Sequence, residues 1–431
     1  QYLTVIDFIG NYENNYLVPI ALFGDTSYNK DTVRKLISSG ARSLSGSSTI
    51  NFDKITKEAI YRSIDKTNLK QKKSLKNDYD LLKFKLGFSP LMMDFLEHGS
   101  RDPFHYVQYS NSSFYAFAKS IDNSLEEDLD QNHVSLLRYF SKEINNSIRV
   151  EESLLLLMIL KYGTVSFAEL NNQLGAKYGY NIDLKTWESV LNNIDLAYIT
   201  ERKDGQLKRV SDVHGFICLE RKSDLKVDLG SSLKKAIQNS VFRRYFEDNV
   251  KYSIAKFDKT FNIEDYSNGI VLYQKYSRKD VFRVLNWDLQ PLAQNVGGYM
   301  FHPNNLNCPI FVNYHKEEDI SDTTKYEDGF IDEETIIYMS KSKRNMNSPD
   351  VIKFRDAEKR SIRLPLFIKK DNAEGDDFYY MGDVNPISKS FEDSKLWDTE
   401  NQKNVSLVKM VFHLHRPVEK GMFKYLTTDR Y

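Results

Sequence analysis

The sequence has only two cysteines, Cys218 and Cys308, among its 431 residues. Two cysteines cannot form a disulfide framework, and alone they cannot build a four-cysteine zinc site. They favour a reducing environment, so we expect a cytoplasmic location. No apolar run reaches the roughly 18 residues that a membrane-spanning helix needs, and we expect no membrane partner.

The motifs of common catalytic sites are also missing. No phosphate-binding loop of the Gly-x4-Gly-Lys-Ser/Thr type occurs, so the acidic stretch Ile331–Thr335 is not interpreted as an ATPase box. Pro349-Asp350 resembles the start of a metal-nuclease motif, but the next Asp-x-Lys begins only at Asp393. His413 and His415 alternate along an expected strand and share a face, yet no further Cys or His cluster accompanies them. We therefore expect no catalytic residue, metal site or cofactor in this chain.

The chain has no net charge, because 60 lysines and arginines balance 60 acidic residues. Hydrophobic residues make up 41% of the sequence, a normal globular composition. Its length suggests two to four domains. The chain opens in a strand-like run, Tyr2–Ile9, which is typical of a buried parallel strand. We interpret residues 1–62 as the tail of an α/β domain, and the whole chain as part of a longer protein.

Residues 63–235 have a helical pattern. A buried helix is expected over 154–160, ending at Gly163. Ser166 with Glu169 has the form of a capping box, which begins a second helix that runs to Leu174. A further helix is expected around Thr186–Asn193, and Asp204-Gly205 predicts a hairpin turn between two short strands. Three helices followed by a hairpin is the order of a winged helix, which can bind DNA or only pack against other domains.

Residues 236–431 contain several short runs rich in Tyr, Phe and Ile, broken by turns. The runs are 269–273, 309–314, 335–339, 364–368, 378–381 and 405–415. Such spacing predicts a mostly antiparallel barrel or sandwich. The expected fold class is therefore a multidomain α+β protein.

Charge in this last region is strongly polarised. Residues 317–334 hold nine acidic residues against Lys325, and residues 341–370 hold ten basic residues against three acidic ones. The two segments could pair across strands, or the basic one could bind nucleic-acid phosphates. Aromatic residues lie beside charges in the same region, where they could hold a base or simply form the core.

Several short blocks, in this order, resemble a known family. They are Tyr2–Tyr12, Gly24–Lys30, Ser48–Ile55, Tyr276–Val281, Gly297–Tyr299, Pro309–Val312, Tyr326–Phe330, Met339–Ser342 and Phe378–Gly382. The first three are similar to the end of the second RecA-like lobe of DEAD/DEAH-type helicases. Together the blocks resemble the C-terminal half of the SauUSI-like single-chain type IV restriction endonucleases, which are modification-dependent and ATP-dependent.

The resemblance implies three domains: a helicase-lobe tail (1–62), a helical coupler (63–235) and an SRA-like target-recognition barrel (236–431). The barrel would bind double-stranded DNA and flip out 5-methyl- or 5-hydroxymethylcytosine. The residues implied for the base pocket are Tyr326, Asp328, Phe330 and Tyr338. Those implied for DNA contacts are Tyr276, Ser277, Arg278, Ser340, Ser342, Lys343 and Arg344.

The same resemblance implies that ATP and Mg act in upstream helicase and nuclease domains of the parent enzyme, a hydrolase, and it leaves a homodimer open. Two alternative functions remain at this stage. The chain could be a protein-interaction or assembly module, or a non-specific DNA-binding accessory domain of a helicase.

Overall fold

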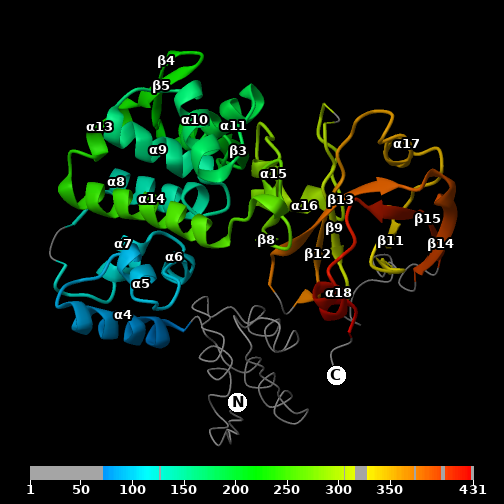
Figure 1. Cartoon of the computed structure of the whole chain (residues 1–431), viewed down its shortest axis with the longest axis horizontal. Helices are drawn as coiled ribbons and strands as arrows, with labels where there is room; N and C mark the ends of the chain where they lie inside the picture. Colours follow the sequence, from blue (N-terminus) through cyan, green and yellow to red (C-terminus); the bar gives the residue numbers. More distant parts are fainter. Residues whose placement is uncertain are drawn as a thin grey trace, which may run out of the picture. The chain divides into compact units, whose positions relative to one another are not determined.

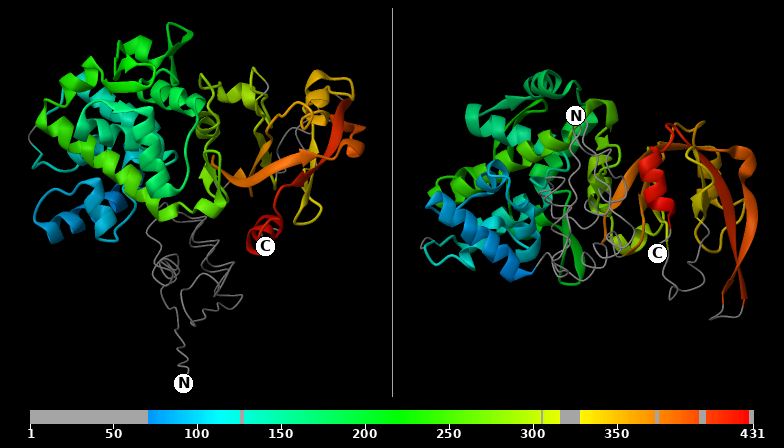
Figure 2. Two further views of the ribbon diagram at one scale, coloured as in Figure 1. Left: turned by 45° about the horizontal axis from the view of Figure 1, so that its top comes forward. Right: turned by 60° about the horizontal axis from the view of Figure 1, so that its bottom comes forward.

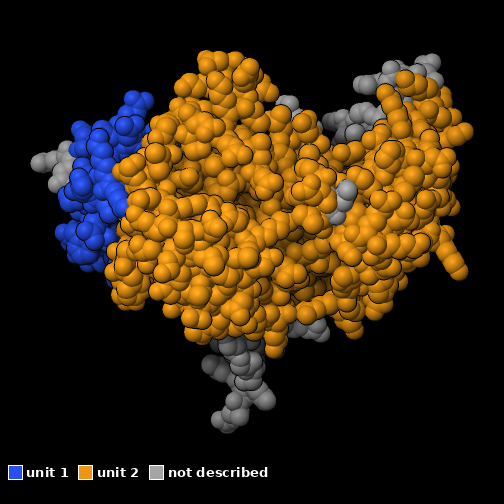
Figure 3. Space-filling model, turned by 90° about the horizontal axis from the view of Figure 1, so that it is seen from above, with its two compact units in different colours: residues 1–147, 234–256 blue, residues 148–233, 257–431 orange. Residues whose placement is uncertain are grey.

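The computed structural model describes residues 71–125, 128–304, 306–315, 328–372, 375–398 and 403–428. The predicted helicase-lobe tail, residues 1–62, and the predicted pocket residue Tyr326 lie outside these ranges. The chain divides into two compact units, Gln1–Ser147 with Lys234–Lys256, and Ile148–Leu233 with Phe257–Tyr431 (Figure 3). The division into three domains stays a prediction.

The described part of the first unit is helical (Figure 1). Its elements are α4 (Lys72–Leu86), α5 (Met92–Glu97), α6 (Phe104–Ser110), α7 (Phe114–Lys119), α8 (Gln131–Tyr139), the π-helical turn η2 (Phe140–Ile144) and most of α14 (Ser240–Thr260), which follows α13 (Ser231–Ala236). Aromatic rings fill its core. The ring centres of Phe140 and Phe246 lie 5.1 Å apart, and those of Tyr115 and Tyr245 also lie 5.1 Å apart. These contacts bury the apolar face of α14 against helices that come much earlier in the chain.

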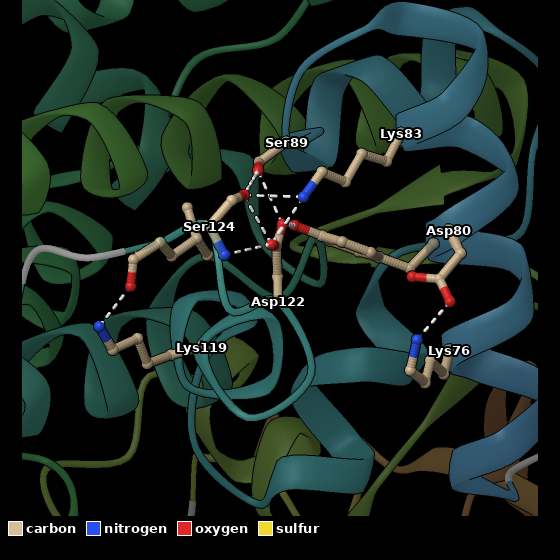
Figure 4. Close-up of polar contacts among 9 residues, drawn as sticks. Lys76, Asp80, Lys83, Ser89, Lys119, Asp122 and Ser124 are labelled. Carbon is tan, nitrogen blue, oxygen red and sulfur yellow. Dashed lines mark hydrogen bonds and ion pairs between the residues drawn. The ribbon is translucent and has the colours of Figure 1, made fainter.

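A buried carboxylate, Asp122, ties α4 to the segment after α7 (Figure 4). It accepts hydrogen bonds from the Tyr79 hydroxyl (2.8 Å), the Lys83 ammonium (2.6 Å) and the Ser89 hydroxyl (2.7 Å). The backbone N–H and hydroxyl of Ser124 donate to it as well. Burial alone would raise the pKa of Asp122, but these donors stabilise its ionised form and hold the pKa well below its usual range.

The second unit begins with the predicted helical module. Its elements are α9 (Val150–Tyr162), β1 (Val165–Ser166), α10 (Phe167–Tyr178), α11 (Leu184–Ile194), β2 (Thr200–Lys203), β3 (Gln206–Arg209), α12 (Val210–His214), β4 (Leu219–Ser223) and β5 (Lys226–Leu229). The capping box is present, with the Ser166 side chain accepting from Glu169 N and the Glu169 carboxylate accepting from Ser166 N. The hairpin with its Asp204-Gly205 turn is present too. The three-stranded sheet β1-β5-β4 was not predicted.

The C-terminal part of this unit is built on an eight-stranded sheet. Its strands follow the order β10-β11-β15-β13-β12-β9, with β14 paired to β15 and β8 paired to β13. They are β8 (Lys275–Tyr276), β9 (Ile310–Asn313), β10 (Gly329–Phe330), β11 (Thr335–Met339), β12 (Pro365–Lys369), β13 (Phe378–Pro386), β14 (Glu392–Asp398) and β15 (Lys403–Leu414), preceded by the short pair β6 (Tyr266–Ser267) and β7 (Ile270–Val271). Figure 2 shows the long hairpin of β14 and β15, orange to red, extending from the sheet.

The sheet differs from the predicted antiparallel barrel. Strands β9 and β12 are parallel, because the chain makes a long crossover between them. Among the described residues, no ladder joins the end strands β9 and β10, so the strands form a curved mixed sheet without closing. The SRA-like fold therefore stays a prediction.

Both faces of the sheet are covered. One face forms a large apolar cluster with α17 (Pro349–Arg355), through Val351 and Phe354, and with α18 (Lys420–Thr427), through Met422 and Leu426. The opposite face packs on α15 (Arg278–Val284), where Arg278 and Phe282 contact Phe311 of β9. Helix α16 (Ala293–Val296) follows α15. This burial on two faces explains why the strands are near-continuous apolar runs in the sequence.

Candidate nucleic-acid interface

The basic segment 341–370 begins in the loop that follows β11 and continues through α17 and β12. Its ion pairs with acidic residues are mostly local: Arg344 pairs with Asp350, and Arg360 with Asp356. Arg363 pairs with Asp383 on β13. Of the acidic segment, the structure describes residues 328–334, and two of these contact residues outside the basic segment. Asp332 accepts from the backbone and hydroxyl of Thr335, and Glu334 lies 3.6 Å from His413.

Beside α17 the surface has a hollow of about 310 Å³, lined by Arg344, Ser348, Pro349, Asp350 and Lys353. Asp350 Oδ2 accepts from the Tyr299 hydroxyl at 2.6 Å and from Arg344 Nε at 2.7 Å. Burial alone would raise the pKa of Asp350, but these two donors lower it below its usual value. Asp350 therefore remains ionised and fixes the position of Arg344.

The charge around this hollow is positive overall. Lys341 lies over the Tyr299 ring, with 4.8 Å from its nitrogen to the ring centre, and Lys353 lies 5.4 Å from the centre of Phe301. Burial lowers the pKa of Lys341 from its ordinary value. The lining of the hollow thus has two cations, Arg344 and Lys353, and one carboxylate that already has two donors. Such a surface attracts an anion with several acceptor oxygens, such as a phosphate group.

Three of the predicted base-pocket residues, Asp328, Phe330 and Tyr338, lie at the β10–β11 edge, but their described contacts are structural. Tyr338 is 3% exposed, and its hydroxyl donates to the carbonyl of Gly298 at 2.9 Å. Asp328 accepts from the backbone N–H of Met339 at 2.8 Å. Phe330 packs 5.5 Å from Phe423. A base could stack on the Tyr338 ring only if the covering side chains moved, and the pocket stays a prediction.

The predicted DNA contacts fall into two separate groups. Tyr276 is buried and accepts from the backbone N–H of Val271, while Ser277 caps α15 through Asp280 N. Arg278 stacks over Phe378 at 4.8 Å and over Phe311 at 5.3 Å. Burial lowers the pKa of Arg278. This first group packs on the face of the sheet that α15 covers.

The second group follows β11. Ser340 is completely buried, where its hydroxyl donates to the carbonyl of Lys341 and accepts from Val408 N. Ser342 accepts from Arg344 through its carbonyl. Lys343 is exposed, and Arg344 lines the hollow. Lys343 and Arg344 are thus the two predicted contacts that the structure places where a phosphate could reach them.

Sequence reasoning did not single out three residues of the hollow: Ser348, Asp350 as the partner of Arg344, and Lys353. The signal for Lys353 was present, because it belongs to the basic segment. The contact of Tyr299 with Asp350 had no sequence signal, since 51 residues separate them. Among the described residues no three His, Cys, Asp or Glu side chains form a possible metal cluster, and none of the helices there could span a bilayer.

Two family models match parts of this chain. Residues 270–426 match a domain of unknown function, DUF3427, and residues 75–260 match a second, DUF8090. No curated protein matches the sequence.

Three solved structures are similar in part. The DNA modification-dependent restriction endonuclease AspBHI is 14% identical, covering 35% of this chain and 77% of its own, with a TM-score of 0.24. The sulfur-binding and SRA domains of ScoMcrA, complexed with phosphorothioated DNA, are 9% identical, covering 70% of this chain and 94% of theirs, with a TM-score of 0.24. The type IV phosphorothioation-dependent restriction endonuclease ScoMcrA is 8% identical, covering 72% of this chain and 59% of its own, with a TM-score of 0.23.

Proposed function

We propose that this chain is the DNA-recognition part of a modification-dependent restriction endonuclease. In this proposal the region from 236 to 431 binds duplex DNA and recognises a flipped 5-methyl- or 5-hydroxymethylcytosine. An upstream ATP-driven motor and nuclease would act on the recognised site. The order of sequence blocks described above supports the family, and the hollow beside α17 supports the ligand.

The observation that carries DNA binding is the charge arrangement of the hollow. Arg344 is held by Asp350 and by the carbonyl of Ser342, so its guanidinium keeps one orientation, while the N–H groups that these two acceptors do not use stay available for a ligand. Lys353 adds a second cation on the same wall. A fixed guanidinium beside an ammonium suits a phosphodiester, because phosphate accepts several charge-assisted hydrogen bonds.

The first test is fluorescence-anisotropy binding of the chain to one duplex with and without a central 5-methylcytosine. We expect affinity to fall steeply between low and physiological salt, since phosphate contacts release counterions. We also expect tighter binding of the methylated duplex. Equal binding of both duplexes would reduce the function to a backbone contact, the non-specific accessory role.

Variants locate the contact. Arg344→Ala with Lys353→Ala removes two cations from the hollow and is expected to lower the slope of log affinity against log salt by about 2. Lys420→Ala with Lys424→Ala is the matched control, because both lysines are exposed on α18, which lies at another end of the sheet from α17 (Figures 1 and 2). Absence of any salt-dependent binding would favour the protein-interaction function.

A further inference from the structure

The winged-helix order of α9, α10, α11 and the β2–β3 hairpin raises the question of which element faces a ligand. In a DNA-reading module of this kind, the last helix before the hairpin would enter the major groove. Here α11 has contacts within its own unit instead. Asn286 donates to the Thr186 hydroxyl at 2.8 Å, and Asn192 donates to the carbonyl of Asp288 at 3.0 Å.

The chain just after α11 is engaged in the same way. The Tyr198 hydroxyl donates to the carbonyl of Lys279 at 3.0 Å, and the carbonyl of Tyr198 accepts from Gln290 N at 3.0 Å. Residues 279–290 therefore cover this side of the module. The helix that would read bases serves as an intramolecular packing surface.

The β2–β3 hairpin is left exposed, and its geometry is well defined. Asp204 and Gly205 both have positive φ, 54° and 75°, as a tight two-residue turn of the hairpin type requires. The register pairs Thr200 with Arg209 and Arg202 with Leu207. Since side chains alternate between faces along each strand, these four lie on one face of the hairpin.

That face carries two arginines without an acidic partner among the described residues, Arg202 and Arg209, and both are exposed. The two arginines are diagonal neighbours across the hairpin, so their backbone positions lie roughly 7–8 Å apart. Leu207 lies beside them and is 38% exposed. The lysines of the opposite face are engaged: Lys203 reaches the carbonyl of Val213, and Lys208 lies 3.8 Å from Asp204.

We propose that the β2–β3 hairpin is a second DNA contact, in which Arg202 and Arg209 bind backbone phosphates and Leu207 contacts the sugar edge between them. The inference rests on the proposed function, and it gives the helical module a sequence-independent role in holding the duplex. A polyanion fits because the two guanidiniums have no internal carboxylate to neutralise them, and arginine suits phosphate through its fork of donors. Contacts to phosphate fix position and carry no base information.

The test compares two double variants of the full chain. Arg202→Ala with Arg209→Ala removes the two cations of the proposed contact. Lys203→Ala with Lys208→Ala removes the same charge from the opposite face of the same hairpin. All four side chains lie on a surface hairpin, and circular dichroism and thermal unfolding check that both variants keep the wild-type fold.

We expect the arginine variant to lower the salt slope of duplex binding by nearly 2, at about 0.9 per phosphate contact. It should weaken methylated and unmethylated duplexes by the same factor, so that their affinity ratio does not change. The lysine variant should retain the wild-type slope to within about 0.5. Equal slopes in the arginine variant and wild type would overturn the inference.

The variant of the hollow, Arg344→Ala with Lys353→Ala, separates this inference from the proposed function. If that variant loses affinity and the arginine variant does not, the hairpin contact is wrong and the proposed function stands. If the wild-type chain binds no duplex, both are wrong. If both variants lower the slope and the quadruple variant lowers it by the sum, two independent phosphate contacts are established.

Discussion

The Tyr338 hydroxyl donates to the carbonyl of Gly298 at 2.9 Å, and the same carbonyl accepts from Phe311 N at 2.7 Å. One peptide group thereby connects β11 with β9, which lie far apart in the strand order. The curved sheet is held together at this point by a side chain and a loop in place of a strand ladder. Gly298 is required here, because a Cβ at this position would lie 2.6 Å from the Tyr338 oxygen.

Replacing Gly298 with Ala should therefore destabilise the second unit. The added carbon must displace the Tyr338 hydroxyl, and we expect a loss of about 1–3 kcal/mol in the free energy of unfolding. Urea denaturation measures it. Gly421→Ala is the control, because the nearest atom to a Cβ there is the side chain of Glu419 at 3.8 Å; an equal loss in both variants would contradict the close approach.

Tyr338→Phe separates the hydroxyl from the ring. It removes one hydrogen bond and keeps the aromatic packing with Phe412, so the expected loss is about 0.5–1.5 kcal/mol. Phenylalanine keeps a ring that can stack, so methylated-duplex binding by this variant should match wild type unless the hydroxyl itself contacts the base. A selective loss of affinity for the methylated duplex would give the hydroxyl a role in the base pocket.

Asp122 should stabilise the first unit at neutral pH. Its pKa is lowered in the folded state, so this stabilisation is present above pH 4 and is lost as pH falls through the folded pKa. Asp122→Ala leaves the Tyr79 hydroxyl, buried at 0% residue exposure, without its acceptor, and we expect a loss of roughly 3 kcal/mol. Asp80→Ala is the control, because it breaks only an exposed pair with Lys76 (Figure 4). Chemical denaturation should show that this variant loses about 0–1 kcal/mol in the free energy of unfolding.

Asp248 should have the opposite pH dependence. Burial raises the pKa of this carboxyl to about 6, although the backbone N–H groups of Met92 and Met93 donate to it. Its charged form is disfavoured in the folded state, so its contribution to stability is greatest below pH 4 and falls as pH rises from 4 to 6.

Asp248→Asn removes this titration. The free energy of unfolding of the variant, relative to wild type, should rise by on the order of 2 kcal/mol between pH 4 and pH 7. Thermal unfolding at several pH values measures the difference. A difference that stays constant across that range would contradict a raised pKa.

Arg149 should be necessary for the fold of the second unit. It is fully buried, pairs with Glu152 at 2.6 Å, and donates to the carbonyl of Arg283 and to Asn286 Oδ1. Arg149→Met leaves Glu152 buried without its cation, and we expect a loss of roughly 3–5 kcal/mol. Arg221→Ala breaks a half-exposed pair with Glu188, where at most about 1 kcal/mol is expected; similar losses in both would contradict the buried pair.

The features that sequence alone determined are local ones. The capping box of Ser166 and Glu169 and the turn at Asp204-Gly205 depend on residues within three positions of each other. Strand β11 was predicted at Thr335–Met339, with the bounds observed, because a run of β-branched and aromatic residues favours a strand wherever it packs.

Tertiary structure decided which side chains are available for binding. Tyr338 and Ser340 lie in the same aromatic and polar stretch as Lys343 and Arg344, and the sequence does not distinguish them. Curvature of the sheet brings Gly298 and Val408 against the first two and buries them, while Arg344 meets Asp350 beside α17. The hollow, the open sheet and the engagement of α11 all arise from contacts between residues far apart in the chain, and these depend on how the strands pack and cross over.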